Sequence, residues 1–454
     1  MAIESINPAT GQLLETFTEY SPAEVAGIIE QVHGAWADWR QTPAGRRSKL
    51  MRALATELRR DQERLACLIT EEMGKPLGES RGEIDKCAWV CDHYAEHAAS
   101  YLAPETVASD AGHSQVAFRP LGVVLAVMPW NFPLWQVFRF AAPALMAGNV
   151  GLLKHSSNVP RCALAIEQLF VRAGFPADVF RTLLIGSRQV DAVIAHKTVR
   201  AVTLTGSDLA GRRVAAKAGE MLKKSVLELG GSDPFIVMPD ADLAEAAIQG
   251  ARSRCLNSGQ SCIAAKRFIV FEEVCHKFVA LLRQAMAELT VGDPMREDTR
   301  LGPMARGDLR DELHAQVQAS VAAGAELVLG GQPLPQAGYY YPPTILSEVR
   351  PGMPAYDQEL FGPVAAIIRV RDVAEAVAVA NDTVFGLGAS IWSGDNAGAE
   401  ALAAEIEAGA VFVNGMVKSD PRLPFGGIKE SGYGRELADY GIREFVNIQT
   451  VWVR

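Results

Sequence analysis

Hydrophobic residues recur along the chain with two different periods, and the first hundred residues follow the helical one. After a turn at Asn7–Gly11 between short predicted strands, Ser21, Pro22 and Glu24 give the signals of a helix start: a capping hydroxyl, a first-turn proline and a reciprocal carboxylate. Apolar residues then recur at three- and four-residue intervals as far as Trp39. The same spacing predicts further helices over about 45–72 and 79–100.

From about residue 121 the pattern changes to short, continuous apolar runs. Helical patterns over about 134–147, 159–173, 189–195 and 209–222 separate these runs. The runs are Gly122–Met128, Val150–Lys154, Val179–Leu184, Ala201–Thr205 and Ser225–Leu229. Uniformly apolar strands that alternate with helices predict a parallel, doubly wound sheet with both faces covered.

A second α/β unit is predicted from Pro234 onward. A strand at Pro234–Met238, a helix over about 241–255, a strand at Arg267–Phe271 and a helix near 273–289 begin it, and the alternation returns over 364–413. The ending, Phe445–Val453, has the composition of a strand, which would need a partner at its edge. The predicted fold class is therefore α/β.

Composition excludes several classes of function. The 454 residues are 49% hydrophobic and 21% charged, a balance typical of soluble globular proteins with two or three domains. A net charge of −9 argues against a nucleic-acid partner. The sequence predicts no signal peptide and no membrane helix, and its seven scattered cysteines do not form a disulfide framework. We therefore expect a cytoplasmic protein.

The segments that follow the predicted strands carry the candidate chemistry. In a doubly wound sheet, ligands bind outside the carboxyl ends of the strands, so these segments should share one edge. Gly206 and Ser207 at a helix start can offer backbone N–H groups to a phosphate, although neither a G-x-G-x-x-G nor a Walker A motif is present. The segments are Pro129–Pro133, Lys154–Asn158, Thr205–Gly211 and Glu228–Gly231.

Cys262 stands in a small, polar segment, Asn257–Lys266, rather than in apolar packing. A thiol becomes a nucleophile as thiolate, in a partly open and polar or electropositive setting. Local sequence alone leaves a nucleophile and an ordinary loop cysteine as alternatives. His93 and His97 match an H-x-x-E-H zinc pattern, but no third ligand is evident, and a solvated helix face is the better interpretation. No metal site is predicted.

Taken together, these motifs resemble the aldehyde dehydrogenase superfamily over essentially the whole chain, and within it the bacterial succinate-semialdehyde dehydrogenases. The likeness also rests on Glu359–Pro363 and Pro424–Gly427. It implies a Rossmann-type parallel-sheet cofactor domain (1–101 and 121–230), an α/β catalytic domain (231–430) and a small β oligomerisation flap (102–120 and 431–454). A homodimer or homotetramer is implied.

The resemblance also implies the chemistry. Cys262 would add to an aldehyde to give a thiohemiacetal, and the Asn131 amide and the Cys262 backbone N–H would hold its oxyanion. After hydride transfer to a nicotinamide, Glu228 would activate the water that hydrolyses the thioester. Its apolar neighbours predict a raised pKa for Glu228. Taken singly, Asn131 could be a turn residue and Glu228 a strand-end charge in water.

For the cofactor, the resemblance implies a dinucleotide site. Ser157 stands where NAD-preferring relatives often carry glutamate, and beside Lys154 it favours a 2′-phosphate. We therefore expect NADP to be accepted and preferred, with NAD as the alternative. The implied cofactor residues are Pro129, Trp130, Lys154, Ser157, Gly206, Ser207, Gly211, Leu229, Glu359 and Phe361.

For the substrate, the resemblance implies that Arg139 grips the distal carboxylate of succinate semialdehyde, with Ser419 as a second contact. Leu256 stands where human-type relatives have a further arginine, which puts a two-arginine clamp in doubt. A surface ion pair is the alternative for Arg139. Other readings of the whole protein are oxidation of another short or ω-carboxylated aldehyde such as glutarate semialdehyde, a thiol hydrolase, and a non-catalytic member of the fold.

Overall fold

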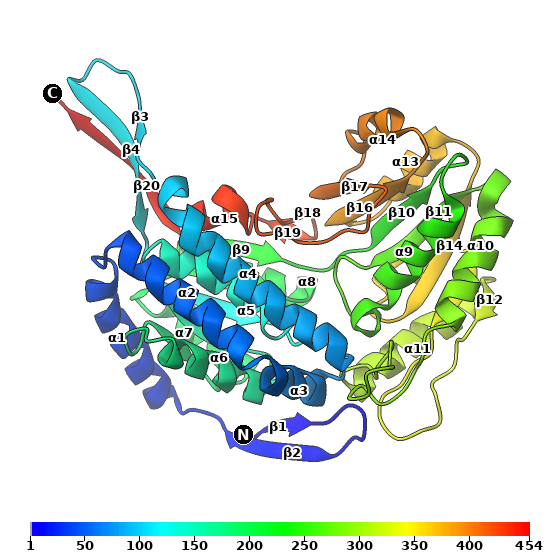
Figure 1. Cartoon of the computed structure of the whole chain (residues 1–454), viewed down its shortest axis with the longest axis horizontal. Helices are drawn as coiled ribbons and strands as arrows, with labels where there is room; N and C mark the ends of the chain where they lie inside the picture. The colour runs from blue at the N-terminus through cyan, green and yellow to red at the C-terminus, as the bar shows by residue number, and fades with distance from the viewer. Residues whose placement is uncertain (1) are drawn as a thin grey trace.

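Two largely parallel sheets, one in each half of the chain, form the centres of two lobes in the computed structural model, which describes residues 2–454 (Figure 1). The first sheet has the order β19-β9-β8-β5-β6-β7, with only β19 antiparallel to its neighbour. Its strands are β19 (Gly432–Tyr433), β9 (Lys224–Glu228), β8 (Val199–Thr205), β5 (Val123–Met128), β6 (Val150–His155) and β7 (Phe180–Thr182). The parallel sheet predicted from the apolar runs is confirmed.

Helices cover the first sheet and are close to those predicted. The capping box between Ser21 and Glu24 is present at the start of α1. The single helix predicted over 45–72 is wrong, because Asp61 has a non-helical ψ of 15° and separates two helices while accepting hydrogen bonds from Arg64 and Arg172. The helices are α1 (Pro22–Trp39), α2 (Ala44–Arg60), α3 (Gln62–Met73), α4 (Leu77–Tyr101), α5 (Trp135–Met146), α6 (Pro160–Arg172), α7 (Val190–Ala195) and α8 (Asp208–Glu220).

The second lobe contains a seven-stranded sheet with the order β12-β13-β14-β11-β10-β16-β17, in which only β12 is antiparallel to its neighbour. The strands are β12 (Glu326–Leu329), β13 (Thr344–Ser347), β14 (Val364–Val370), β11 (Ala265–Phe271), β10 (Asp233–Val237), β16 (Gly388–Trp392) and β17 (Ala410–Val413). Its helices are α9 (Leu243–Cys255), α10 (Glu272–Ala287), α11 (Gly307–Ala322), α12 (Pro354–Asp357), α13 (Val373–Asn381) and α14 (Asn396–Ala403).

The chain passes from the first lobe to the second directly between β9 and β10. The segment that carries Cys262 lies between α9 and β11, and its hydrogen bonds with Asn131, which follows β5, hold it beside the first sheet. Smaller elements complete the two lobes: a hairpin of β1 (Ala2–Ile6) and β2 (Leu13–Thr18), a ladder of β15 (Phe385–Gly386) and β18 (Ile428–Lys429), the helix α15 (Ala438–Arg443), and the 3₁₀ turns η1 (Ser187–Gln189) and η2 (Leu256–Gly259).

A three-stranded arm extends away from the first lobe (Figure 1). The terminal strand β20 (Val446–Val453) pairs along its length with β4 (His113–Pro120), which also pairs with β3 (Glu105–Thr106). Within the predicted 431–454 segment, β19 instead joins the first sheet, and the backbone of Ala438 accepts a hydrogen bond from Tyr94. The domain boundaries stay a prediction.

No helix within residues 2–454 is both long enough and apolar enough to cross a bilayer.

Candidate active site

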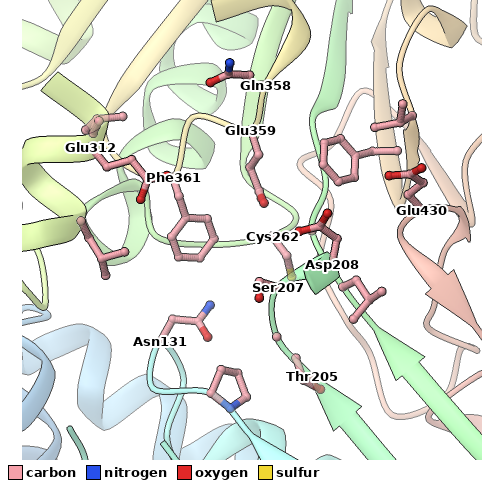
Figure 2. A pocket seen from close by; sticks show the side chains of 18 of the residues that line it. Asn131, Thr205, Ser207, Asp208, Cys262, Glu312, Gln358, Glu359, Phe361 and Glu430 are labelled. Carbon is pink, nitrogen blue, oxygen red and sulfur yellow. The ribbon is translucent and has the colours of Figure 1, made fainter. Parts of the chain in front are cut away.

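A cavity of about 500 Å³ is lined by residues of both lobes (Figure 2). Asn131 follows β5 and Ser207 follows β8, so both reach the cavity from the carboxyl edge of the first sheet, as predicted. Cys262, Glu359 and Phe361 reach it from the second lobe. Of the predicted site residues, those that line it are Pro129, Trp130, Asn131, Gly206, Ser207, Leu229, Cys262, Glu359 and Phe361.

The loop before Cys262 is buried and strained rather than flexible. Asn257 and Ser258 both have left-handed backbone angles, with φ of 56° and 54°. At Gly259, a Cβ would lie 2.3 Å from the carbonyl carbon of Gly362, so a side chain cannot fit there. Asn257 Nδ2 donates to the backbone oxygen of Asn131 at 2.7 Å. The loop is thus fixed against the segment that carries the candidate oxyanion donor.

The Cys262 thiol lies in the partly open setting expected of a nucleophile, with two positive charges acting on it. The residue is half-buried, and burial raises the pKa of the thiol to about 12 against the opposing charges of Lys266 and Arg139. Lys266 Nζ donates to the backbone oxygens of Ser261 and Cys262 at 2.9 and 2.8 Å and forms an ion pair with Glu359 at 3.2 Å. One lysine therefore connects the cysteine backbone to a cavity carboxylate.

Asn131 is oriented by two hydrogen bonds. Its Nδ2 donates to the backbone oxygen of Gln260 at 3.1 Å, and its Oδ1 accepts from Gln136 Nε2 at 3.0 Å. Nδ2 carries two hydrogens, so one remains for a ligand. The backbone N–H of Cys262 donates to no residue in the described part of the chain. Two donors therefore remain free in one cavity.

Glu228 ends β9 close to the cavity, although it does not line it. Its carboxylate oxygens are buried without a hydrogen-bond partner among residues 2–454. A Cβ on Gly426 would lie 2.6 Å from Glu228 Oε1, so this glycine leaves room for the carboxyl group. Burial raises the pKa of Glu228 well above its ordinary value, opposed by Arg139 and increased further by Glu436. The raised pKa agrees with the one predicted from its apolar neighbours.

Arg139 and Ser419 also lie outside the lining of the cavity. The Arg139 guanidinium is buried, forms an ion pair with Glu436, donates to Thr205 Oγ1 at 3.2 Å and lies 4.7 Å from the centre of the Phe425 ring. The surface ion pair considered as an alternative is therefore wrong, because the pair is buried. Ser419 Oγ accepts a hydrogen bond from Lys86 at 2.8 Å.

The residues expected to hold a dinucleotide form a chemically suitable set. Lys154, at the end of β6, is half-buried and has no ion-pair partner in residues 2–454; burial lowers its pKa. Ser157 nearby in sequence is exposed. Ser207 caps α8, and Phe361 meets Trp130 edge-on at 5.9 Å across the two lobes. An unpaired cation, a helix start and aromatic walls fit a phosphate-bearing dinucleotide.

Gly211 allows α8 to pack closely against the residue that follows β9. A Cβ there would lie 2.6 Å from two methyl carbons of Leu229, so the glycine lets α8 approach the end of β9. Its contact with a cofactor stays a prediction.

Several residues around the cavity were missed in the sequence. Gln136, Lys86 and Glu436 lie on or beside helices and belong to no short motif. Lys266 offered a signal, because Lys266 and Arg267 interrupt the apolar run of β11, where all seven residues are buried. Charged residues inside a buried strand need internal partners, and that pattern marks them for attention.

The H-x-x-E-H segment is part of α4, and the solvated helix face expected for it is wrong for His93, which is buried. The His93 ring lies 4.7 Å from that of His97, and its Nε2 hydrogen-bonds with the Tyr101 hydroxyl at 3.2 Å. Within residues 2–454, no group of three histidine, cysteine or acidic side chains could hold a metal ion.

Comparisons with known proteins agree with this geometry. A model of the aldehyde dehydrogenase family matches residues 1–451. The chain is 53% identical to a probable succinate-semialdehyde dehydrogenase [NADP(+)] of Synechocystis sp. and 50% identical to succinate-semialdehyde dehydrogenase [NADP(+)] 1 of Mycobacterium tuberculosis, each over all of both chains.

Solved structures agree as well. Succinic semialdehyde dehydrogenase from Streptococcus pyogenes, solved with NADP+, is 39% identical with a TM-score of 0.97 over 99% of each chain. Succinate-semialdehyde dehydrogenase from Burkholderia pseudomallei is 35% identical with a TM-score of 0.96, covering all of this chain and 94% of the other. The full-length match, the two-lobed fold and the cavity with its cysteine together show that this chain belongs to the aldehyde dehydrogenase family.

Proposed function

We propose that the protein oxidises succinate semialdehyde to succinate with NADP as its preferred cofactor and NAD as the alternative. One observation carries the proposal: Asn131 and Cys262, from different lobes, share a cavity with Glu359 and Phe361, the residues expected at the nicotinamide end of the cofactor. The relatives at 50–53% identity, whose names specify this substrate and NADP(+), support the choice of both.

Cys262 starts the reaction. Its thiolate, which the positive charges of Lys266 and Arg139 favour, adds to the aldehyde carbon and gives a thiohemiacetal. The oxyanion accepts hydrogen bonds from Asn131 Nδ2 and from the Cys262 backbone N–H, the two donors left free in the cavity. The dinucleotide, when bound, accepts the hydride that leaves this carbon. A thioester on Cys262 remains.

Glu228 completes the reaction by taking a proton from the water that attacks the thioester. A carboxylate whose pKa is raised by burial is a stronger base than one in water. Its two unpartnered oxygens are free to accept a hydrogen bond from that water. Succinate then leaves, and the thiol is regenerated.

Lys154 and Ser157 select the cofactor. The Lys154 ammonium has no ion-pair partner within residues 2–454, and Ser157 adds a hydroxyl donor and no competing negative charge. A 2′-phosphate gives the lysine a counter-charge, which the ribose hydroxyl of NAD does not. Arg139 and Ser419 are proposed to face the distal carboxylate of the substrate, although Glu436 offsets part of the arginine charge.

The proposal includes a homodimer or homotetramer in the cytoplasm, joined through the arm. Ile448 and Trp452 on β20 are 62% and 49% exposed, an unusual surface for a monomer. All seven cysteines are free thiols, which suits a reducing compartment.

The test measures formation of reduced nicotinamide by absorbance, with NADP and with NAD, over butanal, succinate semialdehyde and glutarate semialdehyde. We expect the highest kcat/KM with succinate semialdehyde and NADP, and loss of turnover in Cys262→Ala. Equal kcat/KM values for butanal and succinate semialdehyde would overturn the proposed substrate. A higher kcat/KM with NAD than with NADP would overturn the proposed cofactor preference. Turnover that survives in Cys262→Ala would overturn the mechanism.

A further inference from the structure

Lys86 is a half-buried cation without a carboxylate partner. It lies on α4, where its Nζ donates to Ser419 Oγ at 2.8 Å and lies 4.4 Å from the centre of the Trp135 ring. Within residues 2–454 no Asp or Glu oxygen comes within 4.0 Å of it. Holding an ammonium group away from water with one hydroxyl and one ring as partners is costly.

The acidic groups that act on Lys86 already have other partners. Asp420 pairs with Arg422 at 2.6 Å, and Glu83 pairs with Lys75. Burial is the main cause that lowers the pKa of Lys86 to about 8. The nearby positive charge of Arg139 is the second cause. Arg139 has Glu436 as its counter-charge, whereas Lys86 has none, so an anion beside Lys86 would stabilise its charge.

Lys86 contacts α5, the helix that also carries Gln136 of the cavity lining. Trp135, which Lys86 contacts, and Arg139 are four residues apart and therefore lie on one face of the helix. The intervening Gln136 lines the cavity and donates to Asn131 at 3.0 Å. One helix thus carries the ring that Lys86 contacts, the guanidinium of Arg139 and the amide that orients the candidate oxyanion donor.

The hydroxyl of Ser419 is suitably polarised. Because its oxygen accepts from Lys86, its own hydrogen is free to donate elsewhere. An ammonium and a hydroxyl held 2.8 Å apart offer two donors to a single carboxylate. Leu256, at the place where a second arginine was considered, offers none.

We propose that Lys86 binds the distal carboxylate of the aldehyde substrate together with Ser419 and Arg139, and so sets the preference for ω-carboxylated over uncharged aldehydes. The inference rests on the proposed function and adds the residue that supplies the second positive charge. Lys86 is thereby a specificity-determining residue.

The test compares succinate semialdehyde with butanal, which has the same number of carbons and no carboxylate. In Lys86→Met, kcat/KM for succinate semialdehyde is expected to fall about 10- to 100-fold, as for loss of a charged hydrogen bond, mostly through KM. The value for butanal should change by less than about threefold. Lys86→Arg, which keeps the charge, should recover most of the loss. Lys418→Met, which removes the exposed lysine next to Ser419, is the control and should leave both substrates unchanged.

The outcomes separate the inference from the proposed function. A wild-type enzyme that does not prefer succinate semialdehyde over butanal overturns the function. A wild-type preference that Lys86→Met retains, but that Arg139→Met abolishes, overturns the inference and leaves Arg139 as the sole cation. Lys86→Gln, which keeps a donor for Ser419 without the charge, repeats the test if the methionine variant does not fold, as judged by its thermal melting.

Discussion

Two of the carboxylates buried in the first lobe, those of Glu83 and Glu228, have opposite surroundings. Glu83 on α4 pairs with Lys75 and accepts from the backbone N–H groups of Leu134 and Trp135 at 2.8 and 3.0 Å, so it ties α4 to the start of α5. Glu228 at the end of β9 has no hydrogen-bond partner for either oxygen among the described residues 2–454. A fully paired buried charge fixes a fold, whereas an unpaired one keeps its capacity for a reacting molecule.

Two lysines of the same lobe repeat the contrast. Lys75 is buried, pairs with Glu83 and lies 4.0 Å from the centre of the Phe132 ring. Lys154, half-buried at the end of β6, has no ion-pair partner within residues 2–454. The unpaired lysine and the unpaired glutamate both lie at the carboxyl edge of the first sheet, where ligands bind in this class of fold. Among these four groups, pairing therefore separates the two that support the fold, Glu83 and Lys75, from the two that we propose to serve the site.

Glu228→Gln should give the largest effect, because it removes the base and keeps the shape. We expect kcat to fall about 10²- to 10⁴-fold, the usual contribution of a positioned base. The melting temperature should stay the same or rise, since a neutral amide is less costly to bury. Stopped-flow absorbance should show a burst of about one equivalent of reduced cofactor per active site, because acylation precedes the blocked step.

Cys262→Ala, which cannot form the thioester, is the control and should show no burst. A Glu228→Gln enzyme with normal kcat would remove Glu228 from the mechanism. A loss of kcat accompanied by a lower melting temperature would make Glu228 a structural residue like Glu83, and the comparison would fail.

Glu83→Gln should act mainly on stability. The amide nitrogen of glutamine would face the Lys75 ammonium, leaving a buried charge uncompensated at a cost of about 3 kcal/mol in the free energy of unfolding. Urea unfolding followed by fluorescence measures the change. Glu96→Gln, on the same helix with a side chain 72% exposed, should leave the unfolding curve unchanged. If Glu83→Gln and Glu96→Gln unfold alike, the pairing around Glu83 does not stabilise the fold.

The sequence predicts the sheets better than it predicts these pairings. The period of the apolar pattern and the length of each apolar run suffice to predict strands such as β5 and β6, because all positions but one in each strand are buried. The same reasoning predicts one continuous helix through Asp61, because a polar residue between apolar positions does not interrupt the apolar spacing. Strand ends also indicate which segments share an edge, and Asn131, Ser207 and Leu229 do line one cavity.

Pairings between distant charged residues could not be predicted. Lys86 and Ser419 are 333 positions apart, and nothing in either segment indicates the other. The same holds for Arg139 and Glu436, which the helical pattern does not join. The Cys262 segment has a polar composition, yet its polar side chains are buried because they hydrogen-bond with segments remote in sequence. Composition gives the capacity for hydrogen bonds and not the identity of the partners.

Ser157→Glu tests the unpaired cation by offering Lys154 a carboxylate from the chain itself. The negative charge would compete with a 2′-phosphate, so kcat/KM for NADP should fall about 10- to 100-fold while that for NAD stays the same or rises. Steady-state kinetics with each cofactor measures the ratio. Ser157→Ala, which removes the hydroxyl without adding charge, should have a smaller effect. Equal loss for both cofactors would show that residue 157 lies outside the 2′-phosphate site.

The smallest effect concerns pH and follows from the raised pKa of Glu228. Burial favours the protonated form in the folded state, whereas in the unfolded chain the group ionises near its ordinary value of 4.5. Above that value the folded protein therefore holds a proton that the unfolded chain has lost, and stability falls as pH rises, by about 1.4 kcal/mol per pH unit, until the folded pKa is passed. Urea unfolding of the wild type and of Glu228→Gln at a series of pH values measures this slope as the difference between the two proteins. Glu436, whose pKa burial also raises, is present in both proteins but interacts with Glu228, so the difference reports the coupled pair of carboxyl groups. Parallel curves would mean that Glu228 is paired in solution after all, and the contrast with Glu83 would no longer separate a reacting group from a supporting one.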